Sequence, residues 1–129
     1  MVSNLKKKFQ GERLTVVHCE GALESFENAL NSVNPPKKRT GMAMWMVRQI
    51  EQLANKGRLS GENYPLEGNL PKNGGKFRAL KKIPIRGYCW HSKKHPHTVF
   101  ISHYIYKAKD KLDQKDTDRV VANWRKIEE

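Results

Sequence analysis

The sequence has little cysteine, a minority of acidic residues and no long hydrophobic run. Its 129 residues include two cysteines, Cys19 and Cys89, too few for a disulfide framework. Neither lies in a spacing typical of a zinc site. The longest nearly unbroken apolar run, 42–47, is far too short to span a bilayer, and no apolar stretch of the kind found in secretion signals follows the first lysines. These absences predict a reduced, cytoplasmic protein with no metal, no cofactor and no membrane partner.

What the sequence has in excess is positive charge. Lysine and arginine number 25 against 13 aspartates and glutamates, which gives a net charge of +12. Residues 71–115 contain twelve cations and two anions, so +10 of that charge falls in one segment that also holds most of the histidines. Cations attract the phosphate backbone, and aromatic side chains among them stack on unpaired bases. The segment therefore favours nucleic-acid binding, with a solvated basic face that keeps the protein soluble as the alternative.

Hydrophobic periodicity predicts one domain over residues 1–129. The expected elements are a strand at 14–19, helices at 21–33 and 40–56, strands at 76–82, 86–91 and 97–107, and a C-terminal helix from 113 onward. Asp113 and Asp116 are expected to start this last helix, because acidic residues in the first turn suit the helix dipole. The basic segment 1–13 is expected to be a flexible arm, and 58–75, rich in glycine and proline, a long loop. The order β-αα-βββ-α predicts an α+β fold, in which an N-terminal helical hairpin packs on an antiparallel sheet and a C-terminal helix follows.

The cations of the expected sheet should lie together on one rigid platform, and side-chain alternation assigns some residues of the strands to a common face. Within the strand 86–91, Arg86, Tyr88 and Trp90 share one face. The strand 97–107 has apolar residues on both faces, which is typical of a central strand. Which face meets the helices depends on the pairing register.

Three segments resemble the RelE/HigB-type toxins of bacterial type II toxin–antitoxin modules, members of the RelE/ParE superfamily. They are KFRALKKIPIRGYCWHS (76–92), TVFISHYIYKAKDKL (98–112) and DRVVANWRKI (118–127). The match is best over 76–112, whereas 14–57 agrees in architecture only. The resemblance implies a RelE-like fold and a metal-independent endoribonuclease that cleaves mRNA on the ribosome, inhibits translation and is neutralised by a cognate antitoxin. Two alternatives stay open: a toxin of the same fold that binds a protein such as DNA gyrase, as the ParE-like branch does, and a non-catalytic nucleic-acid-binding module.

The resemblance also implies which residues act in catalysis. The substrate's own 2′-hydroxyl is the nucleophile, so the enzyme must remove its proton, stabilise charge at phosphorus and protonate the leaving oxygen. Arg86 matches the arginine that contacts the scissile phosphate. Arg78 and Lys81 lie near the basic pair of the preceding strand, and Lys107 matches the cationic end of the last strand. His103 is the expected acid or base because imidazole titrates near neutrality, and a buried structural histidine is the alternative.

A second group of residues is expected to bind RNA. It consists of Lys82, Lys109, Lys111, Tyr106 and His91. Lys82, like Lys76, is also an alternative to the basic pair because the register is open. Tyr106 would stack on a base, although a tyrosine at a strand end is more often packed, and His91 is a second acid–base candidate. The expected sheet offers no carboxylate base, which leaves Glu62 and Glu67 of the loop as remote candidates.

Overall fold

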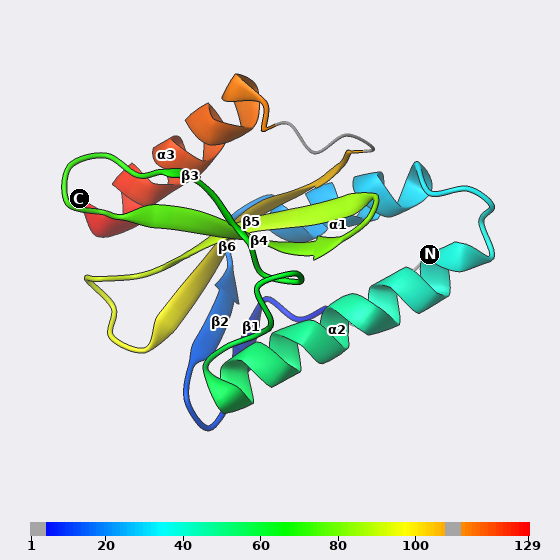
Figure 1. Ribbon diagram of the computed structural model, residues 1–129, viewed down its shortest axis with the longest axis horizontal. Coiled ribbons are helices and arrows are strands. Elements are labelled where there is room, and N and C mark those ends of the chain that lie inside the picture. Colours follow the sequence, from blue (N-terminus) through cyan, green and yellow to red (C-terminus); the bar gives the residue numbers. More distant parts are fainter. Residues whose placement is uncertain (1–4, 108–111) are drawn as a thin grey trace.

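The computed structural model describes residues 5–107 and 112–129, which form an α+β fold of helices around a mixed β-sheet (Figure 1). The elements in chain order are β1 (Lys8–Gln10), β2 (Thr15–His18), α1 (Ala22–Asn31), α2 (Lys38–Lys56), β3 (Leu66–Asn69), β4 (Lys76–Lys82), β5 (Ile85–His91), β6 (Thr98–Tyr106) and α3 (Gln114–Glu128). The six strands lie in the order β1-β2-β6-β5-β4-β3. None of the described helices combines the length and hydrophobicity that a membrane crossing requires.

The sheet is mixed, so the expectation of an antiparallel sheet was wrong at one strand pair. β2 runs parallel to β6, with Val16 opposite Val99, while the other neighbouring strands are antiparallel. Parallel neighbours need a long connection, and here most of the domain lies between β2 and β6. The strands β4, β5 and β6 do form the expected antiparallel meander.

Two edge strands were missed. Lys8–Gln10 lies in the segment expected to be a flexible arm, yet it forms β1 and pairs with β2. Leu66–Asn69 lies in the expected long loop, yet it forms β3 and pairs with β4. Both are short and neither has an apolar alternation, so strand pairing and not local sequence determines them. Within the described residues, two strands, not one, therefore precede α1 and α2, and four strands follow them.

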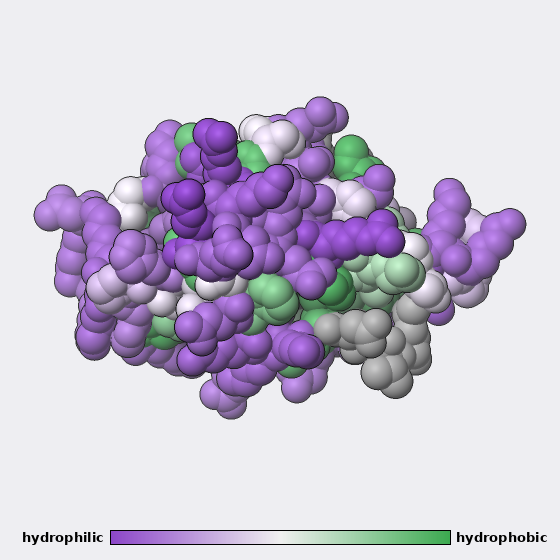
Figure 2. All heavy atoms as spheres, turned by 90° about the horizontal axis from the view of Figure 1, so that it is seen from below, coloured by the Kyte–Doolittle hydropathy of each residue, from purple (hydrophilic) through white to green (hydrophobic). Residues whose placement is uncertain are grey.

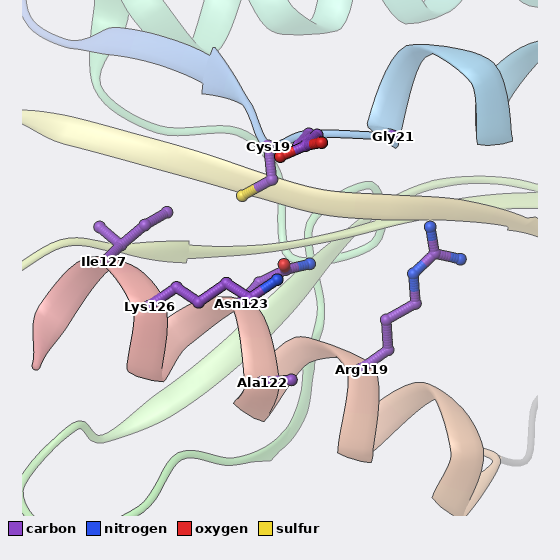
Figure 3. A pocket seen from close by; sticks show the side chains of 8 residues that line it. Cys19, Gly21, Arg119, Ala122, Asn123, Lys126 and Ile127 are labelled. Carbon is purple, nitrogen blue, oxygen red and sulfur yellow. The ribbon is translucent and has the colours of Figure 1, made fainter.

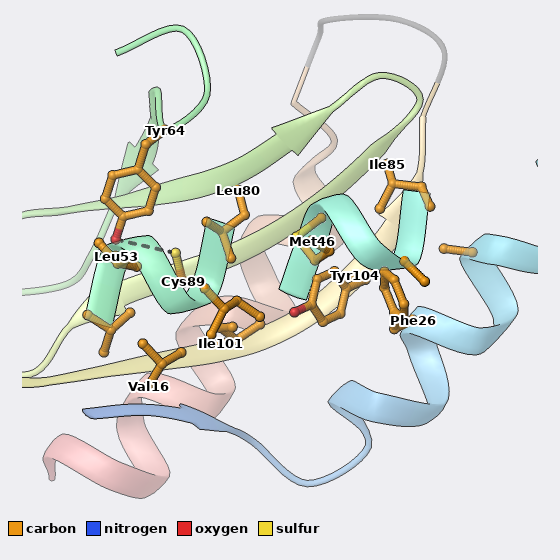
Figure 4. Packing of buried hydrophobic residues seen from close by; sticks show 14 of the residues in the cluster. Val16, Phe26, Met46, Leu53, Tyr64, Leu80, Ile85, Cys89, Ile101 and Tyr104 are labelled. Atoms are coloured by element: carbon orange, nitrogen blue, oxygen red, sulfur yellow. Dashed lines mark hydrogen bonds between the residues drawn. The ribbon is translucent and has the colours of Figure 1, made fainter. Parts of the chain in front are cut away.

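The helices α1 and α2 cover one face of the sheet, called here the α1/α2 face (Figure 4). Phe26, Leu30, Met46 and Leu53 are among the helix residues that pack there. The sheet contributes alternate residues: Val16, Leu80, Ile85, Cys89, Val99, Ile101 and Tyr104. Gly87 is required opposite Tyr104, because a Cβ at this position would lie 2.5 Å from the tyrosine ring.

The helix α3 covers the opposite face, called here the α3 face. Its Val120 and Trp124 pack with Phe77, Ala79, Tyr88 and Trp90 of the sheet. Asp113, an expected start signal, is the N-cap and accepts a hydrogen bond from the Lys115 amide at 3.2 Å. At the other end, a Glu128 carboxylate oxygen accepts from the amides of Lys93 and Lys94, each at 3.0 Å. The N-terminal end of α3 is thus capped by its own side chain, and the C-terminal end is attached to the turn between β5 and β6.

The side of the molecule that faces down in Figure 1 has a mostly hydrophilic surface (Figure 2). Hydrophobic side chains appear there as small separate spots. The exposed large hydrophobic residues are Met44, Leu66, Ile83 and Tyr106, which come from four different elements or turns. Single exposed apolar residues of this kind are common on protein surfaces.

Candidate functional site

The sheet residues expected to act together lie on opposite faces of the sheet. Lys81 has the same alternation as Ala79 and Phe77, which pack under α3, so Lys81 lies on the α3 face. Arg78 and Lys82 alternate with Leu80 and lie on the α1/α2 face. Arg86, Tyr88 and Trp90 share the α3 face, and the predicted common face of these three is confirmed. Tyr106 alternates with Tyr104 and lies on the α1/α2 side.

Arg86 and Lys81 are direct partners in the antiparallel β4–β5 pair. Side chains opposite each other in such a pair lie roughly 5 Å apart at Cβ, so this position of the α3 face carries two neighbouring cations. Arg86 is 2 % exposed, and its Nη1 lies 3.5 Å from Oε1 of Glu67 on β3. The Glu67 side chain is 13 % exposed. A buried cation thus has a carboxylate beside it, which burial of a charge requires.

Tyr88 lies next to this ion pair on the α3 face. Its hydroxyl is buried, and its ring centroid is 5.4 Å from that of His103. Burial raises the pKa of Tyr88 to about 12, the negative charges of Asp116 and Glu67 add to the effect, and Arg86 opposes it. The phenol therefore keeps its proton at neutral pH and is a proton donor, not a base. We name Arg86, Lys81, Glu67 and Tyr88 the β3–β5 cluster.

A chain of hydrogen bonds runs beneath α3 beside this cluster. Nδ2 of Asn123 donates to Oγ of Ser102 at 2.8 Å, and Oγ of Ser102 lies 2.8 Å from Nδ1 of His103. Nε2 of His103 lies 3.1 Å from Oδ1 of Asp116. Because a carboxylate only accepts, Nε2 carries the proton of the neutral ring and Nδ1 accepts from the serine hydroxyl. A β-bulge at Ser102 in β6 turns Ser102 and His103 toward the same helix.

His103 is therefore fully engaged inside the protein. Ser102 and His103 are 0 % exposed, and each ring nitrogen of His103 already has a partner. Burial lowers the pKa of His103, the charge of Arg119 adds to this, and the hydrogen bond to Asp116 opposes it. This geometry favours the alternative of a structural histidine that attaches β6 to the N-terminal part of α3.

Arg78 and His91 take part in a different arrangement on the α1/α2 face. Nη1 of Arg78 donates to the carbonyl oxygen of Tyr64 at 2.8 Å, and its guanidinium lies over the Tyr64 ring, 5.1 Å from the centroid. Nε2 of His91 lies 3.0 Å from the Tyr64 hydroxyl. Both side chains hold the segment before β3 against the sheet. They lie across the sheet from Arg86.

The remaining candidates lie at the margins of the sheet. The Lys82 ammonium is 5.7 Å from the centroid of the Trp45 ring, and Tyr106 is exposed. The Lys107 amide donates to the Pro84 carbonyl at 2.6 Å, which places Lys107 beside the β4–β5 turn. Lys109 and Lys111 lie outside the described residues.

Sequence reasoning gave one carboxylate of this region, Glu67, only a remote role and gave the other, Asp116, no role in the site. Glu67 was a remote candidate for the base because it lay in an apparent loop, and only the pairing of β3 with β4 brings it to Arg86. Asp116 was assigned to the helix dipole, and only the bulge at Ser102 aims His103 at it. Within residues 5–107 and 112–129, no three histidine, cysteine or acidic side chains are grouped as a metal site would require.

Compared with family models, with curated proteins and with solved structures, the chain matches none of them.

Proposed function

We propose that the protein is a toxin of RelE/HigB type, an endoribonuclease that cleaves mRNA on the ribosome in the cytoplasm and is neutralised by a cognate antitoxin. The observation that carries the proposal is the β3–β5 cluster. It joins two cations, a carboxylate and a protonated phenol on one face of a sheet. These are the groups that an attack by a 2′-hydroxyl on the adjacent phosphate needs. The net charge of +12 supports a polyanionic substrate.

In this proposal the scissile phosphate replaces Glu67 as the partner of Arg86. The displaced Glu67 carboxylate removes the proton of the 2′-hydroxyl, whose oxygen forms a bond to phosphorus. Arg86 and Lys81 stabilise the negative charge that develops on the phosphorane oxygens. Tyr88 donates its proton to the leaving 5′-oxygen as the phosphorus–oxygen bond breaks. The products are a 2′,3′-cyclic phosphate and a free 5′-hydroxyl.

The test is primer extension on cellular mRNAs after brief induction of the wild type, Arg86→Gln and Arg78→Gln. The two variants remove the same charge from opposite faces of the sheet. We expect new 5′ ends with the wild type and with Arg78→Gln, and a loss of roughly a hundredfold or more with Arg86→Gln. Cleavage by Arg86→Gln at the wild-type level, in folded protein of equal abundance, would exclude this site.

The burial of Arg86 favours a second candidate, a non-catalytic nucleic-acid-binding module. An arginine that is 2 % exposed and paired with a glutamate resembles a structural ion pair more than an open phosphate site. Such a module binds RNA with an affinity that falls steeply with salt, and induction produces no new 5′ ends with any of the three proteins.

A further inference from the structure

A cleft lies between the junction of β2 and α1 and the side of α3 that faces this junction (Figure 3). Its volume is about 600 Å³, within the range of small-molecule sites. Cys19, Glu20 and Gly21 form one wall, and Arg119, Ala122, Asn123, Lys126 and Ile127 form the other. None of these residues belongs to the β3–β5 cluster, so the proposed catalytic function leaves the cleft unexplained.

Two cations face this cleft without a carboxylate bound to them. Among the described residues, neither Arg119 nor Lys126 forms an ion pair. Glu20 is the one carboxylate among the lining residues, so the side chains around the cleft carry a net positive charge. Cys19 adds no negative charge, because burial raises the pKa of its thiol to about 11 even though the charges of Lys7 and Lys126 oppose the rise.

The opposite wall carries the Glu20 carboxylate and, beside it, the positive end of the α1 helix dipole. Gly21 is the N-cap of α1, with φ of +83°, and no side chain caps this helix end. The Arg119 guanidinium points toward it in Figure 3, and a Cβ on Gly21 would lie 3.7 Å from Nη2 of Arg119. A cation close to the positive end of a helix dipole is unfavourable unless an anion lies between them. The guanidinium, the ammonium and the helix end together leave a space suited to an anion.

We propose that this cleft binds a phosphate group, with Arg119 and Lys126 as its charged ligands. The phosphate belongs either to a free nucleotide or inorganic phosphate, or to the backbone of a bound RNA strand. Guanidinium and ammonium groups are the side chains best suited to phosphate oxygens. Asn123 of the cleft wall is the first residue of the hydrogen-bonded chain to Ser102, His103 and Asp116, so the site has a rigid support.

The test follows the backbone amide resonances of Gly21, Ala22 and Leu23 in the full-length protein by NMR. The protein is titrated separately with inorganic phosphate, adenosine 5′-monophosphate and a single-stranded RNA octamer. Saturable shifts with either small ligand identify a free-phosphate site, and saturable shifts with the octamer alone identify an RNA backbone contact. No saturable shift in any of the three titrations would overturn the proposal.

Two double variants test whether Arg119 and Lys126 are the residues that bind the phosphate. Arg119→Gln/Lys126→Gln should weaken binding roughly tenfold or more, whereas Lys115→Gln/Arg125→Gln removes the same charge from α3 outside the cleft and should preserve it. Equal affinities of the two double variants would overturn the proposal. If the cleft variant does not fold, Lys126→Gln alone should still weaken binding roughly threefold or more, and an unchanged affinity would also overturn it. Because the readout is binding at Gly21, failure here is distinct from failure to cleave mRNA.

Discussion

The two faces of the sheet are built differently. The α1/α2 face buries a large apolar cluster, within which His18 and Tyr104 form a hydrogen-bonded pair. The α3 face has a smaller apolar cluster and, beside it, a buried ion pair and a chain of polar side chains. Apolar burial contributes most of the stability of a domain, while buried polar groups constrain geometry. The comparison indicates that one face stabilises the fold and the other holds the groups suited to chemistry.

The largest expected effect is the loss of an apolar side chain from the α1/α2 face. Ile101 is fully buried on that face, whereas Ile105 of the same strand is partly buried on the α3 face. Ile101→Ala should lower the free energy of unfolding by about 2–5 kcal/mol. Ile105→Ala removes a side chain that is already partly exposed to water, so it should lower the free energy of unfolding by only about 1 kcal/mol. Urea unfolding followed by circular dichroism measures both, and equal costs would contradict the difference between the faces.

A pH dependence of stability is expected from His18 on the α1/α2 face. Nδ1 of His18 lies 2.8 Å from the Lys6 carbonyl oxygen and Nε2 lies 2.8 Å from the Tyr104 hydroxyl. Burial lowers the pKa of His18 to about 4, because a ring removed from water is more stable in its neutral form. The unfolded chain therefore binds the proton more tightly. Stability is full above the unfolded pKa, near 6.5, and falls by roughly 3 kcal/mol as the pH drops toward 4.

The matched variant for this prediction is His18→Gln, which has no titratable ring. The free energy of unfolding is measured at pH 7 and pH 4.5 for both proteins. We expect the decrease between these pH values to be smaller in the variant by about 2–3 kcal/mol. Contributions from the rest of the chain are common to both proteins and cancel in the difference. An equal decrease would show that His18 is not held neutral.

A smaller effect is expected from the polar chain on the α3 face. His103→Phe leaves Ser102 and Asp116 without their histidine partner and should cost about 1–3 kcal/mol. Asp116→Asn retains an oxygen that accepts the Nε2 proton, so it should cost under about 1 kcal/mol. Chemical unfolding of the two variants separates these values. If His103→Phe were as stable as the wild type, the chain would have no structural role.

The elements with strong periodicity could be predicted from the sequence. The strand Lys76–Lys82 has the expected boundaries, and β5 and β6 differ from the expected strands by one residue at their ends. The C-terminal helix begins at its acidic cap as expected. In these segments the residues that pack on one face recur at strand or helix spacing in the sequence, so local sequence and tertiary packing agree.

The rest depends on contacts between distant segments. The strands β1 and β3 exist because neighbouring strands pair with them. Their own sequences, KFQ and LEGN, do not indicate a strand. The expected group of cations was divided between faces because alternation separates Arg78 and Lys82 from Lys81. Glu67 could not be assigned to Arg86 before the register of β3 was known.

The most direct test of the central claim, that the α3 face is the one that binds RNA, compares Lys81→Gln with Lys82→Gln. These neighbouring lysines of β4 lie on opposite faces, so the two variants share the charge change and the strand. The measurement is the affinity for a single-stranded RNA as a function of salt. We predict that Lys81→Gln weakens binding roughly three- to tenfold and reduces the salt slope by about one, while Lys82→Gln changes neither. Equal losses in both variants, or a loss in Lys82→Gln alone, would contradict the assignment of RNA binding to the α3 face.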